Sequence, residues 1–176
     1  MSEKTPPSHV SGMAKVIKLP PPDKKGSAVT LEVCLSERKS ARSFVSDKRI
    51  SLRDFSQLLW ASQGVSHFDH EDSMRTAPSA GALYPLEIVS VVSAVDGLSP
   101  GVFSYNPESH SVSALRTTNA ISELSAVTYG QDWISKAPVV FVFLAVIART
   151  AIKYGSPSRT YIAMEIGHAG ENLLLQ

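Results

Sequence analysis

The order of apolar and polar positions predicts two helices in the first third of the chain. Residues 28–38 place apolar side chains at helical spacing. A second helix begins at Ser51, where Ser51 and Asp54 form an acidic variant of the capping box, and Gly64 is typical of its end. The apolar stripe of this helix consists of Leu52, Phe55, Leu58 and Leu59. Residues 66–73 are polar and predict a loop.

Strand patterns dominate the middle of the chain. Residues 86–95 are rich in Val and Ile. Residues 101–105 and 111–115 predict a hairpin whose turn, residues 106–109, reads Asn-Pro-Glu-Ser. Residues 139–148 are apolar throughout, which predicts a central strand buried on both faces of a sheet.

Two further helices complete the predicted order. Asn119 is suited to cap a short helix that extends to about Thr128. A final helix begins near Ser158, and its pattern continues through the last four residues, Leu-Leu-Leu-Gln, without a Gly, Asn or Pro stop signal. We therefore expect that the chain ends inside an element, as a truncated or split protein would.

The composition is that of an ordinary globular protein with one domain. Of the 176 residues, 43% are hydrophobic and 19% are charged. The formal net charge of +1 leaves no broad basic face, which argues against nucleic-acid binding. The single cysteine, Cys34, excludes an intrachain disulfide and a cysteine metal cluster, and its apolar neighbours predict a small buried side chain.

The N-terminal stretch, residues 1–26, is rich in Pro, Ser and Lys and predicts a flexible or extended arm ahead of the domain at 27–176. In a dimer such an arm would wrap the partner subunit, and the sequence leaves both readings open. Residues 1–10 lack the apolar core of a secretory signal, and the longest apolar run, 138–148, is too short to span a bilayer as a helix. We therefore expect a cytoplasmic protein that does not enter a membrane.

The stretch most suggestive of chemistry is residues 75–85, which read R-T-A-P-S-A-G-A-L-Y-P. Pro78 and Pro85 bracket four small residues, 79–82. Because glycine and alanine carry little side-chain bulk, a flat ligand can approach the main chain here and meet its N–H groups. Taken alone, the pattern is equally that of a loop leading into a strand.

Three other motifs accompany this stretch. They are R-K-S-A-R-S-F at 38–44, K-Y-G at 153–155 and G-H-A-G-E-N-L at 167–173. In this order, the four motifs resemble the flavin-dependent nitroreductase superfamily and, within it, the SagB-type dehydrogenase branch. The resemblance extends from about Val16 to the last residue. It implies an α+β fold with a mostly antiparallel central sheet flanked by helices, in three α/β/α layers.

The resemblance also implies an FMN-dependent oxidoreductase that forms a homodimer with flavin at the interface. Hydride would pass between flavin and a small-molecule or peptide-heterocycle substrate. One direction reduces nitro or quinone acceptors with NAD(P)H, and the other dehydrogenates a heterocycle in a modified peptide. The alternative, from a different class, is a non-catalytic or split relative that acts as a dimerisation or scaffold partner.

FMN needs a cationic grip on its phosphate, and residues 38–42 carry suitable donors. Guanidinium groups match phosphate oxygens, and a hydroxyl adds another donor. Without the other motifs, this segment would be a solvated, charged helix end. The resemblance assigns the phosphate most directly to Arg38, Ser40 and Arg42, with Lys39 beside them.

The small-residue motif is expected to supply the slot for the flavin ring and a main-chain N–H near flavin N5. The residues in this role are Pro78, Ser79, Ala80, Gly81 and Leu83. The alternative is a tight loop packed for structural reasons. Tyr84 fits two roles, capping the ring or packing in the core.

Lys153 and Tyr154 follow the strand expected at 139–148. In the azoline-oxidising branch the matching Lys-Tyr pair is considered catalytic, so the resemblance implies that a Lys base removes a ring proton while hydride leaves to flavin. A surface Lys beside an anchoring Tyr is the alternative. Arg159 would add an anion contact, and Asn172 would lie beside the cofactor on the final helix.

Some metal-like patterns are set aside. Glu165 and His168 have an E-x-x-H spacing, but di-iron bundles need two such motifs and further glutamates. The acidic and His-rich stretch 67–72 has no fixed ligand spacing. Neither the glycine pattern of a Rossmann site nor that of a P-loop occurs. We therefore expect no metal site.

Overall fold

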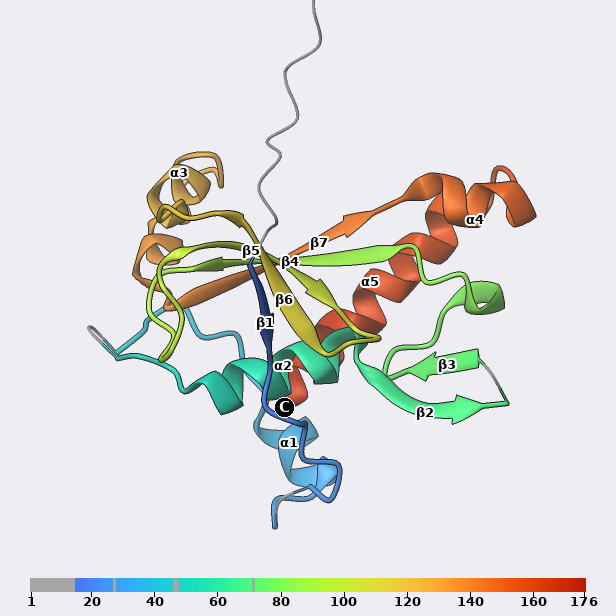
Figure 1. The fold of residues 1–176 in the computed structure, drawn as a ribbon, viewed down its shortest axis with the longest axis horizontal. Coiled ribbons are helices and arrows are strands. Elements are labelled where there is room, and N and C mark those ends of the chain that lie inside the picture. Colours follow the sequence, from blue (N-terminus) through green and yellow to red (C-terminus); the bar gives the residue numbers. More distant parts are fainter. Residues whose placement is uncertain (1–14, 27, 46–47, 71) are drawn as a thin grey trace, which may run out of the picture.

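An antiparallel sheet forms the centre of the protein in the computed structural model, which describes residues 15–26, 28–45, 48–70 and 72–176 (Figure 1). Its strands lie in the order β1-β6-β5-β4-β7, and every neighbouring pair is antiparallel. The strands are β1 (Val16–Lys18), β4 (Leu86–Val92), β5 (Gly101–Asn106), β6 (Ser111–Arg116) and β7 (Val139–Ala145). The prediction of an α+β fold with a mostly antiparallel sheet is confirmed.

Helices α2 (Leu52–Gln63) and α5 (Ser158–Leu175) cover one face of this sheet. Phe55 and Leu59 of α2 are fully buried against Ile88 and Val92 of β4. Burying apolar side chains of this size is the main force that holds helix to sheet. Beside this core, α5 buries Ile162 and Ala169 against Leu86. The two helices therefore form one layer that the sheet orients.

The opposite face carries helix α3 (Ile121–Ala126) and the short 3₁₀ segment η2 (Asp132–Lys136). Ile121 and Ala137 pack there against Val91 of β4. The N-cap residue of this helix is Ala120 and not Asn119 as predicted, although Asn119 Oδ1 still accepts a hydrogen bond of 3.0 Å from the first helical N–H, that of Ile121. Helices thus flank both faces of the sheet, in agreement with the layered fold expected from the sequence.

Helix α2 begins after Ser51 and ends before Gly64, as the sequence predicted. Glycine is required at that end because of its small size and not because of a left-handed backbone. Ser51 Oγ accepts from the Asp54 backbone N–H at 3.0 Å and donates to the Asp54 carboxylate at 2.8 Å, as the capping pattern predicts. Gly64 ends the helix with φ −70°, so no left-handed conformation is required there. A Cβ atom at Gly64 would lie 2.7 Å from Trp60 Cα. Glycine is therefore needed for close approach.

The strand predicted at 139–148 is shorter and lies at an edge of the sheet. Within the described residues, β7 pairs with β4 and ends at Ala145, and Leu144 is 50% exposed. Helix α4 (Ile147–Tyr154) begins two residues later. The prediction of a central strand buried on both faces was wrong because the apolar run continues from the strand into the first turn of this helix.

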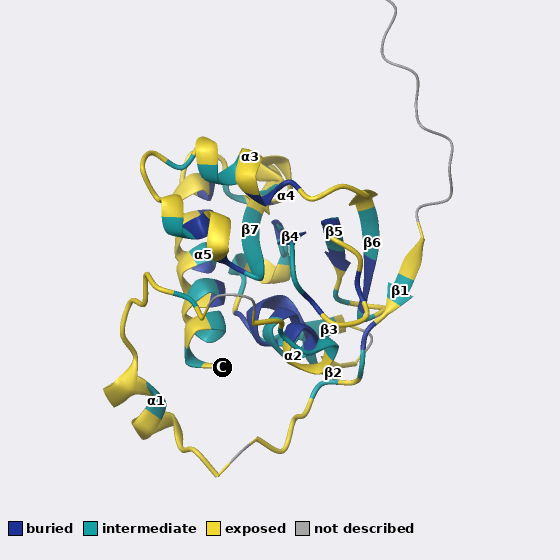
Figure 2. Ribbon diagram, turned by 90° about the vertical axis from the view of Figure 1, so that its left-hand side faces the viewer, coloured by how far each residue is buried: buried dark blue, intermediate teal, exposed yellow. Residues whose placement is uncertain are grey.

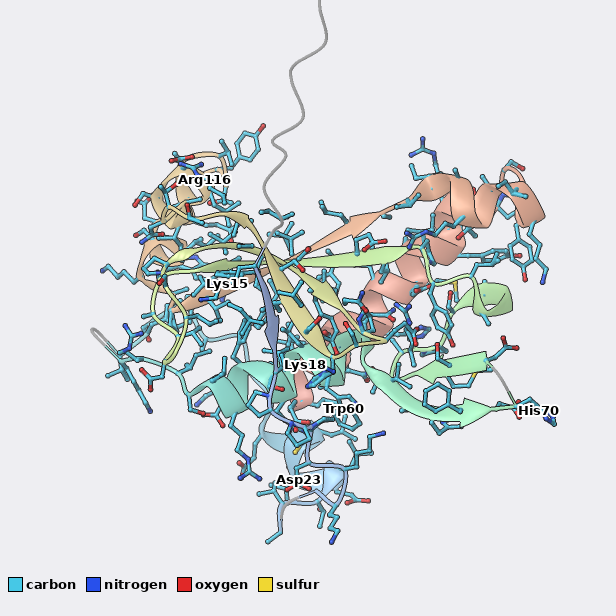
Figure 3. The ribbon with its side chains drawn as sticks, in the orientation of Figure 1. Lys15, Lys18, Asp23, Trp60, His70 and Arg116 are labelled. Atoms are coloured by element: carbon cyan, nitrogen blue, oxygen red, sulfur yellow. The ribbon has the colours of Figure 1, made fainter. Side chains whose placement is uncertain are left out.

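Residues 66–73 form a hairpin instead of the predicted loop. Strands β2 (Val65–Asp69) and β3 (Asp72–Arg75) pair with each other and not with the central sheet. His70 lies near the hairpin tip, at the margin of the molecule (Figure 3). Phe68 is 67% exposed. The residues are polar because both sides of this outlying hairpin meet solvent, which hides its strand character in the sequence.

Helix α1 (Leu31–Glu37) is shorter than the predicted 28–38 and buries none of its residues. Figure 2 shows it standing apart from the dark-blue core. Leu31 and Leu35 are 59% and 54% exposed, and Cys34 is only half-buried. The prediction that Cys34 is a buried side chain was therefore wrong, because α1 packs against the end of α5 and not against the sheet.

The described part of the N-terminal stretch follows the sheet edge. Leu19 is buried in the core after β1, and the Ser56 hydroxyl donates a hydrogen bond of 2.6 Å to the Pro20 carbonyl. The remainder of the predicted arm, residues 1–14, lies outside the described residues. No helix in the described part of the chain is both long enough and apolar enough to cross a membrane.

His110 ties this N-terminal segment to the sheet. Its Nε2 lies 2.7 Å from Ser56 Oγ and 3.0 Å from the Pro20 carbonyl oxygen, and its Nδ1 lies 2.9 Å from the Tyr105 hydroxyl. Burial lowers the pKa of His110, and nearby Lys18 and Lys24 lower it further, against the opposing effect of the Pro20 hydrogen bond. The folded protein therefore favours a neutral ring.

Acidification is expected to weaken the fold through His110. Because the pKa is lowered in the folded state, the unfolded chain binds the extra proton first. The contribution of His110 is complete above the unfolded pKa of about 6.5 and is lost as the pH falls from there through the folded pKa. We expect His110→Gln to lower the free energy of unfolding by roughly 1–3 kcal/mol at about pH 7.5, and by less at about pH 5.

Urea unfolding of both proteins across this pH range checks the prediction. His70→Gln is the matched control, because the His70 side chain is 96% exposed, and it should leave the pH dependence unchanged. A wild-type to His110→Gln difference that stays constant with pH would contradict a neutral, buried role for this ring.

Candidate functional site

The small-residue stretch forms a loop with an unusual backbone. It contains the short 3₁₀ turn η1 (Ala80–Ala82), and positive φ angles of 64°, 54° and 42° occur at Gly81, Ala82 and Tyr84. Non-glycine residues rarely adopt such angles, and surrounding contacts must hold them. The Ser79 side chain supplies one such contact, since its Oγ accepts a hydrogen bond of 3.0 Å from the Tyr84 N–H. We call residues 78–84 the small-residue loop.

The structure places Lys153 and Tyr154 directly against this loop. A Cβ atom at Gly81 would lie 2.7 Å from the Tyr154 hydroxyl and 2.8 Å from Lys153 Nζ. The two motifs are distant in sequence, and the fold brings them to one spot. A lysine amine, a phenol and an exposed main chain therefore share a small area of the surface.

Helices α4 and α5 support this arrangement. The sequence suggested that Lys153 and Tyr154 directly follow a strand. They lie instead at the C-terminal end of α4. The Tyr154 ring makes an edge-on contact with Tyr161 of α5, with ring centroids 5.1 Å apart and planes at 86°. Lys153 Nζ lies 5.5 Å from the centre of the Tyr154 ring. The edge-on contact between the tyrosines fixes the phenol, while the lysine side chain stays exposed.

Tyr84 packs within the protein. The Arg75 guanidinium carbon lies 4.6 Å from the centre of the Tyr84 ring, and the Tyr84 hydroxyl accepts from the Arg75 backbone N–H at 3.3 Å. Its carbonyl accepts a hydrogen bond of 3.0 Å from Arg149 of α4. Of the two roles that the sequence left open, the described contacts match packing. Hairpin β2–β3 therefore braces the loop through Arg75.

A cavity of about 270 Å³ adjoins the loop on the α5 side. It is lined by Pro78, Ser79, Ala80, Tyr161, Met164, Glu165 and His168. Glu165 is only 3% exposed, and burial raises the pKa of its carboxyl, while hydrogen bonds from Ser79 and Gln63 and the nearby charges of Arg75 and His168 oppose that rise. The site therefore contains a buried acid that the sequence analysis considered only as a metal ligand.

Among the described residues, no group of His, Cys, Asp and Glu side chains is arranged to hold a metal ion.

The predicted phosphate segment lies elsewhere. Arg38 forms the C-terminal cap of α1, and Lys39, Ser40 and Arg42 follow it, exposed and without regular secondary structure. In the described part of the chain, the ion pair of this segment joins Arg38 to Glu171 of α5 at 3.9 Å. Ten residues separate Tyr161 from Glu171 on α5, roughly 15 Å at 1.5 Å per residue. One chain therefore does not bring the two groups together.

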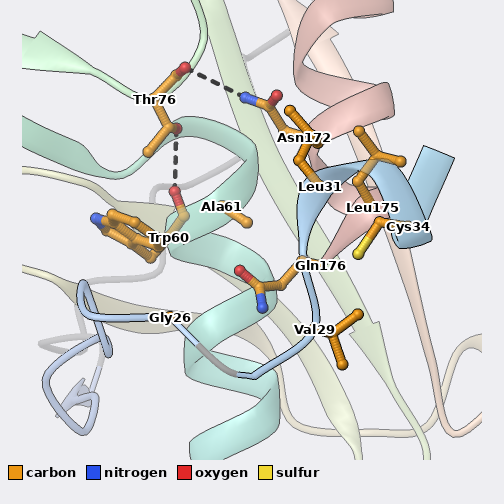
Figure 4. Close-up of a pocket in the computed structure, with 10 residues that line it drawn as sticks. All are labelled: Gly26, Val29, Leu31, Cys34, Trp60, Ala61, Thr76, Asn172, Leu175 and Gln176. Atoms are coloured by element: carbon orange, nitrogen blue, oxygen red, sulfur yellow. Dashed lines mark hydrogen bonds between the residues drawn. The ribbon is translucent and has the colours of Figure 1, made fainter.

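Asn172 lies at the phosphate-segment end of α5, in a cavity of about 480 Å³ between α1, α2 and α5 (Figure 4). Its Nδ2 donates a hydrogen bond of 3.2 Å to the Thr76 carbonyl, and the Thr76 hydroxyl donates one of 3.0 Å to the Trp60 carbonyl. These bonds fasten the base of the small-residue loop to both helices. Cys34 of α1 lines the same cavity.

The sequence analysis missed the polar partners of the loop. Glu165 lies on the helix face that buries Ile162 and Ala169, and an acid within such a stripe is a detectable signal. Gln63 is 1% exposed at the end of α2, and its amide donates to the Glu165 carboxyl at 3.1 Å. Arg159 is exposed in the first turn of α5.

Comparison with known proteins identifies the class. The chain matches the model of the Nitroreductase family over residues 35–176. It is also 37% identical over 147 residues to a nitroreductase homologue of Methanocaldococcus jannaschii, an alignment that covers 84% of this chain and 72% of that protein. Fold and sequence together define an oxidoreductase of the layered α+β type. The chain belongs to the nitroreductase family.

Solved structures share the fold. A nitroreductase homologue from Ralstonia eutropha superimposes with a TM-score of 0.77 and 29% identity, over 99% of this chain and 76% of that one. A second, from Anabaena variabilis, gives 0.75 and 22%, over 96% and 36%. The Escherichia coli microcin synthetase McbBCD complex, with truncated pro-MccB17 bound, gives 0.63 and 22%, over 87% and 60%. The last two support the fold alone.

Proposed function

We propose that this protein is an FMN-dependent oxidoreductase of the SagB-type branch, with the small-residue loop against the flavin ring. The observation that carries the proposal is the close approach at Gly81, where the lack of a side chain lets Lys153 Nζ and the Tyr154 hydroxyl come against the main chain of the loop. Bound flavin would supply the hydride transfer. Family membership supports the general reaction class.

The residues present fit FMN. Gly81 and Ala82 are exposed and offer a surface without side-chain bulk. Lys39 and Arg42 are exposed and form no ion pair with a described residue, so both can receive a phosphate. Asn172 donates one Nδ2 proton to the Thr76 carbonyl and keeps a second N–H and its amide oxygen for a ligand. The Lys39 and Arg42 cations match a phosphate at one end, and the bare main chain at Gly81 and Ala82 matches a flat ring at the other.

The proposal includes a homodimer with the flavin at its interface, as family membership suggests. Arg38 lies near Glu171, whereas the small-residue loop lies near Tyr161 of the same helix. In a homodimer, the phosphate segment of one protomer would meet the loop of its partner. This arrangement is part of the proposal, as is the use of NAD(P)H as electron donor.

Lys153 would act on the substrate. Its Nζ lies at the edge of the loop, where the free amine would accept a proton from one ring carbon of a heterocycle while hydride leaves the adjacent ring carbon for the flavin. The Tyr154 hydroxyl, fixed by Tyr161, would orient the same substrate atom by a hydrogen bond. A heterocycle in a modified peptide needs such a base, and a nitro compound that accepts hydride does not.

We expect the purified protein to retain a yellow flavin spectrum after incubation with excess FMN and desalting. NAD(P)H or dithionite should bleach that spectrum. Visible absorbance is the measurement, and free FMN passed through the same column is the control. A colourless protein would contradict the proposed function and favour a scaffold role for this chain.

A further inference from the structure

A buried polar cluster lies beneath the small-residue loop. Glu165 projects from the face of α5 that otherwise buries Ile162 and Ala169, and it is almost without solvent contact. Burying a carboxyl group costs several kcal/mol, of order 2–7, unless partners satisfy it. Ile162 and Ala169 on this face are apolar, so the carboxyl depends on polar partners from neighbouring elements.

Glu165 has partners from different elements. The Gln63 amide, at the end of α2, donates to it at 3.1 Å. The Ser79 side chain, in the small-residue loop, lines the same cavity as Glu165, which places its hydroxyl to donate to the carboxyl. Arg75 of β3 and His168 of α5 add nearby positive or titratable groups. A single carboxyl thus links the α2–α5 layer to the loop.

The Gln63 amide gives an independent indication of how the cluster is bonded. Its Oε1 is buried and has no hydrogen-bond partner among the described residues. Buried acceptors of this kind are rare, since each costs roughly 1–3 kcal/mol. A protonated Glu165 carboxyl would supply the missing donor, and burial favours that neutral form. An amide in place of Glu165 would offer the same donor and acceptor.

Ser79 transmits this anchoring to the strained part of the loop. Its hydroxyl has one proton, which can be donated to Glu165, and a lone pair that accepts from the Tyr84 N–H. Between Ser79 and Tyr84 lie the positive φ angles at Gly81 and Ala82. Fixing both ends of that segment holds a conformation that the backbone would otherwise leave.

We infer that Glu165 is a positioning residue, which holds the small-residue loop in its ligand-receiving conformation through Ser79 and is itself held by Gln63. The inference rests on the proposed function for the ligand, which is flavin. The loop geometry can be measured without any ligand.

The first test is amide hydrogen exchange by NMR in the protein without flavin. Glu165→Leu and Ser79→Ala should each speed exchange of the Tyr84 amide about tenfold, the effect of losing one buried hydrogen bond. Glu165→Gln should leave that rate within about twofold, because the amide offers a hydrogen-bond donor and an acceptor, as the neutral carboxyl does. The Val89 amide of β4 is the internal control and should keep its rate in every variant.

The second test is FMN affinity by fluorescence titration. Glu165→Leu and Ser79→Ala should weaken binding about tenfold, and the double variant should be no weaker than either single one, because both act through one hydrogen-bonded chain. Glu165→Gln should bind as the wild type does. This pattern would not arise from a general loss of stability.

Three results would overturn the inference. The first is a Tyr84 amide that exchanges at the wild-type rate in Glu165→Leu. The second is equal acceleration at Val89, which would mean that Glu165 only stabilises the core. The third is a Glu165→Gln protein as impaired as Glu165→Leu. If the wild type itself fails to bind FMN, the proposed function fails, while the exchange rates still decide the role of Glu165.

Discussion

Replacing Gly81 by Ala is expected to lower the catalytic rate about 100-fold while the protein stays folded. The added Cβ would lie within 2.8 Å of both Lys153 Nζ and the Tyr154 hydroxyl, so these groups must move. A shift of about 1 Å at reacting groups can cost about 100-fold in rate. The left-handed φ of 64° adds strain of only about 1–2 kcal/mol. Steady-state rates with flavin bound, and urea unfolding, are the measurements.

Two other glycines separate crowding from strain. Gly130→Ala also places Ala at a positive φ, 78°, but no atom lies within 4 Å of its Cβ, so it tests backbone strain alone. Gly167→Ala, in α5, neither places Ala at a positive φ nor brings its Cβ within 4 Å of another atom. Both variants should keep more than about a third of the wild-type rate. A Gly81→Ala protein as active as Gly167→Ala would exclude this loop from the site.

Replacing Lys153 by Ala is expected to reduce dehydrogenation of a peptide heterocycle by 100- to 10,000-fold, roughly the contribution of a positioned general base. Nitro reduction by the same variant should stay within about threefold, because accepting hydride requires no proton removal from the substrate. Both rates are measured on one preparation with equal flavin content, so that cofactor loss cannot imitate a catalytic effect.

Two companion variants sharpen the result. Lys136→Ala removes an exposed lysine from η2, outside the candidate site, and should change neither activity. Tyr154→Phe keeps the ring contact with Tyr161 and removes only the hydroxyl, so its effect on dehydrogenation should be smaller than that of Lys153→Ala. Equal loss of both activities in Lys153→Ala would instead mean that the lysine supports the loop and does not act as a base.

Local sequence signals determined most of the elements. Apolar spacing and the Ser51 cap predicted α2, and the Val- and Ile-rich run predicted β4. The turn at 106–109 predicted the β5–β6 hairpin. These signals lie within a few residues of one another, and the covalent geometry of the chain limits what they can form. The small-residue loop was recognisable for the same reason.

Signals failed where solvent exposure or a continuous apolar run concealed the element. Hairpin β2–β3 is polar because it lies outside the core, and α4 follows β7 without a polar break. Periodicity cannot separate a strand from a helix in a short apolar stretch. The edge position of β7 also has no signature in its own residues, since it depends on which strands pair.

Only the tertiary structure decided which residues share the candidate site. The sequence alone identified the loop around Gly81, and resemblance to a family suggested Lys153, but their contact depends on how α4 packs against α5. The bond between Gln63 and Glu165 joins residues 102 positions apart. Such a contact is stabilised because the two helices are buried together, which no local pattern in the sequence records. The sequence by itself therefore determined the helices, strands and loop, and their packing determined which residues form the candidate site.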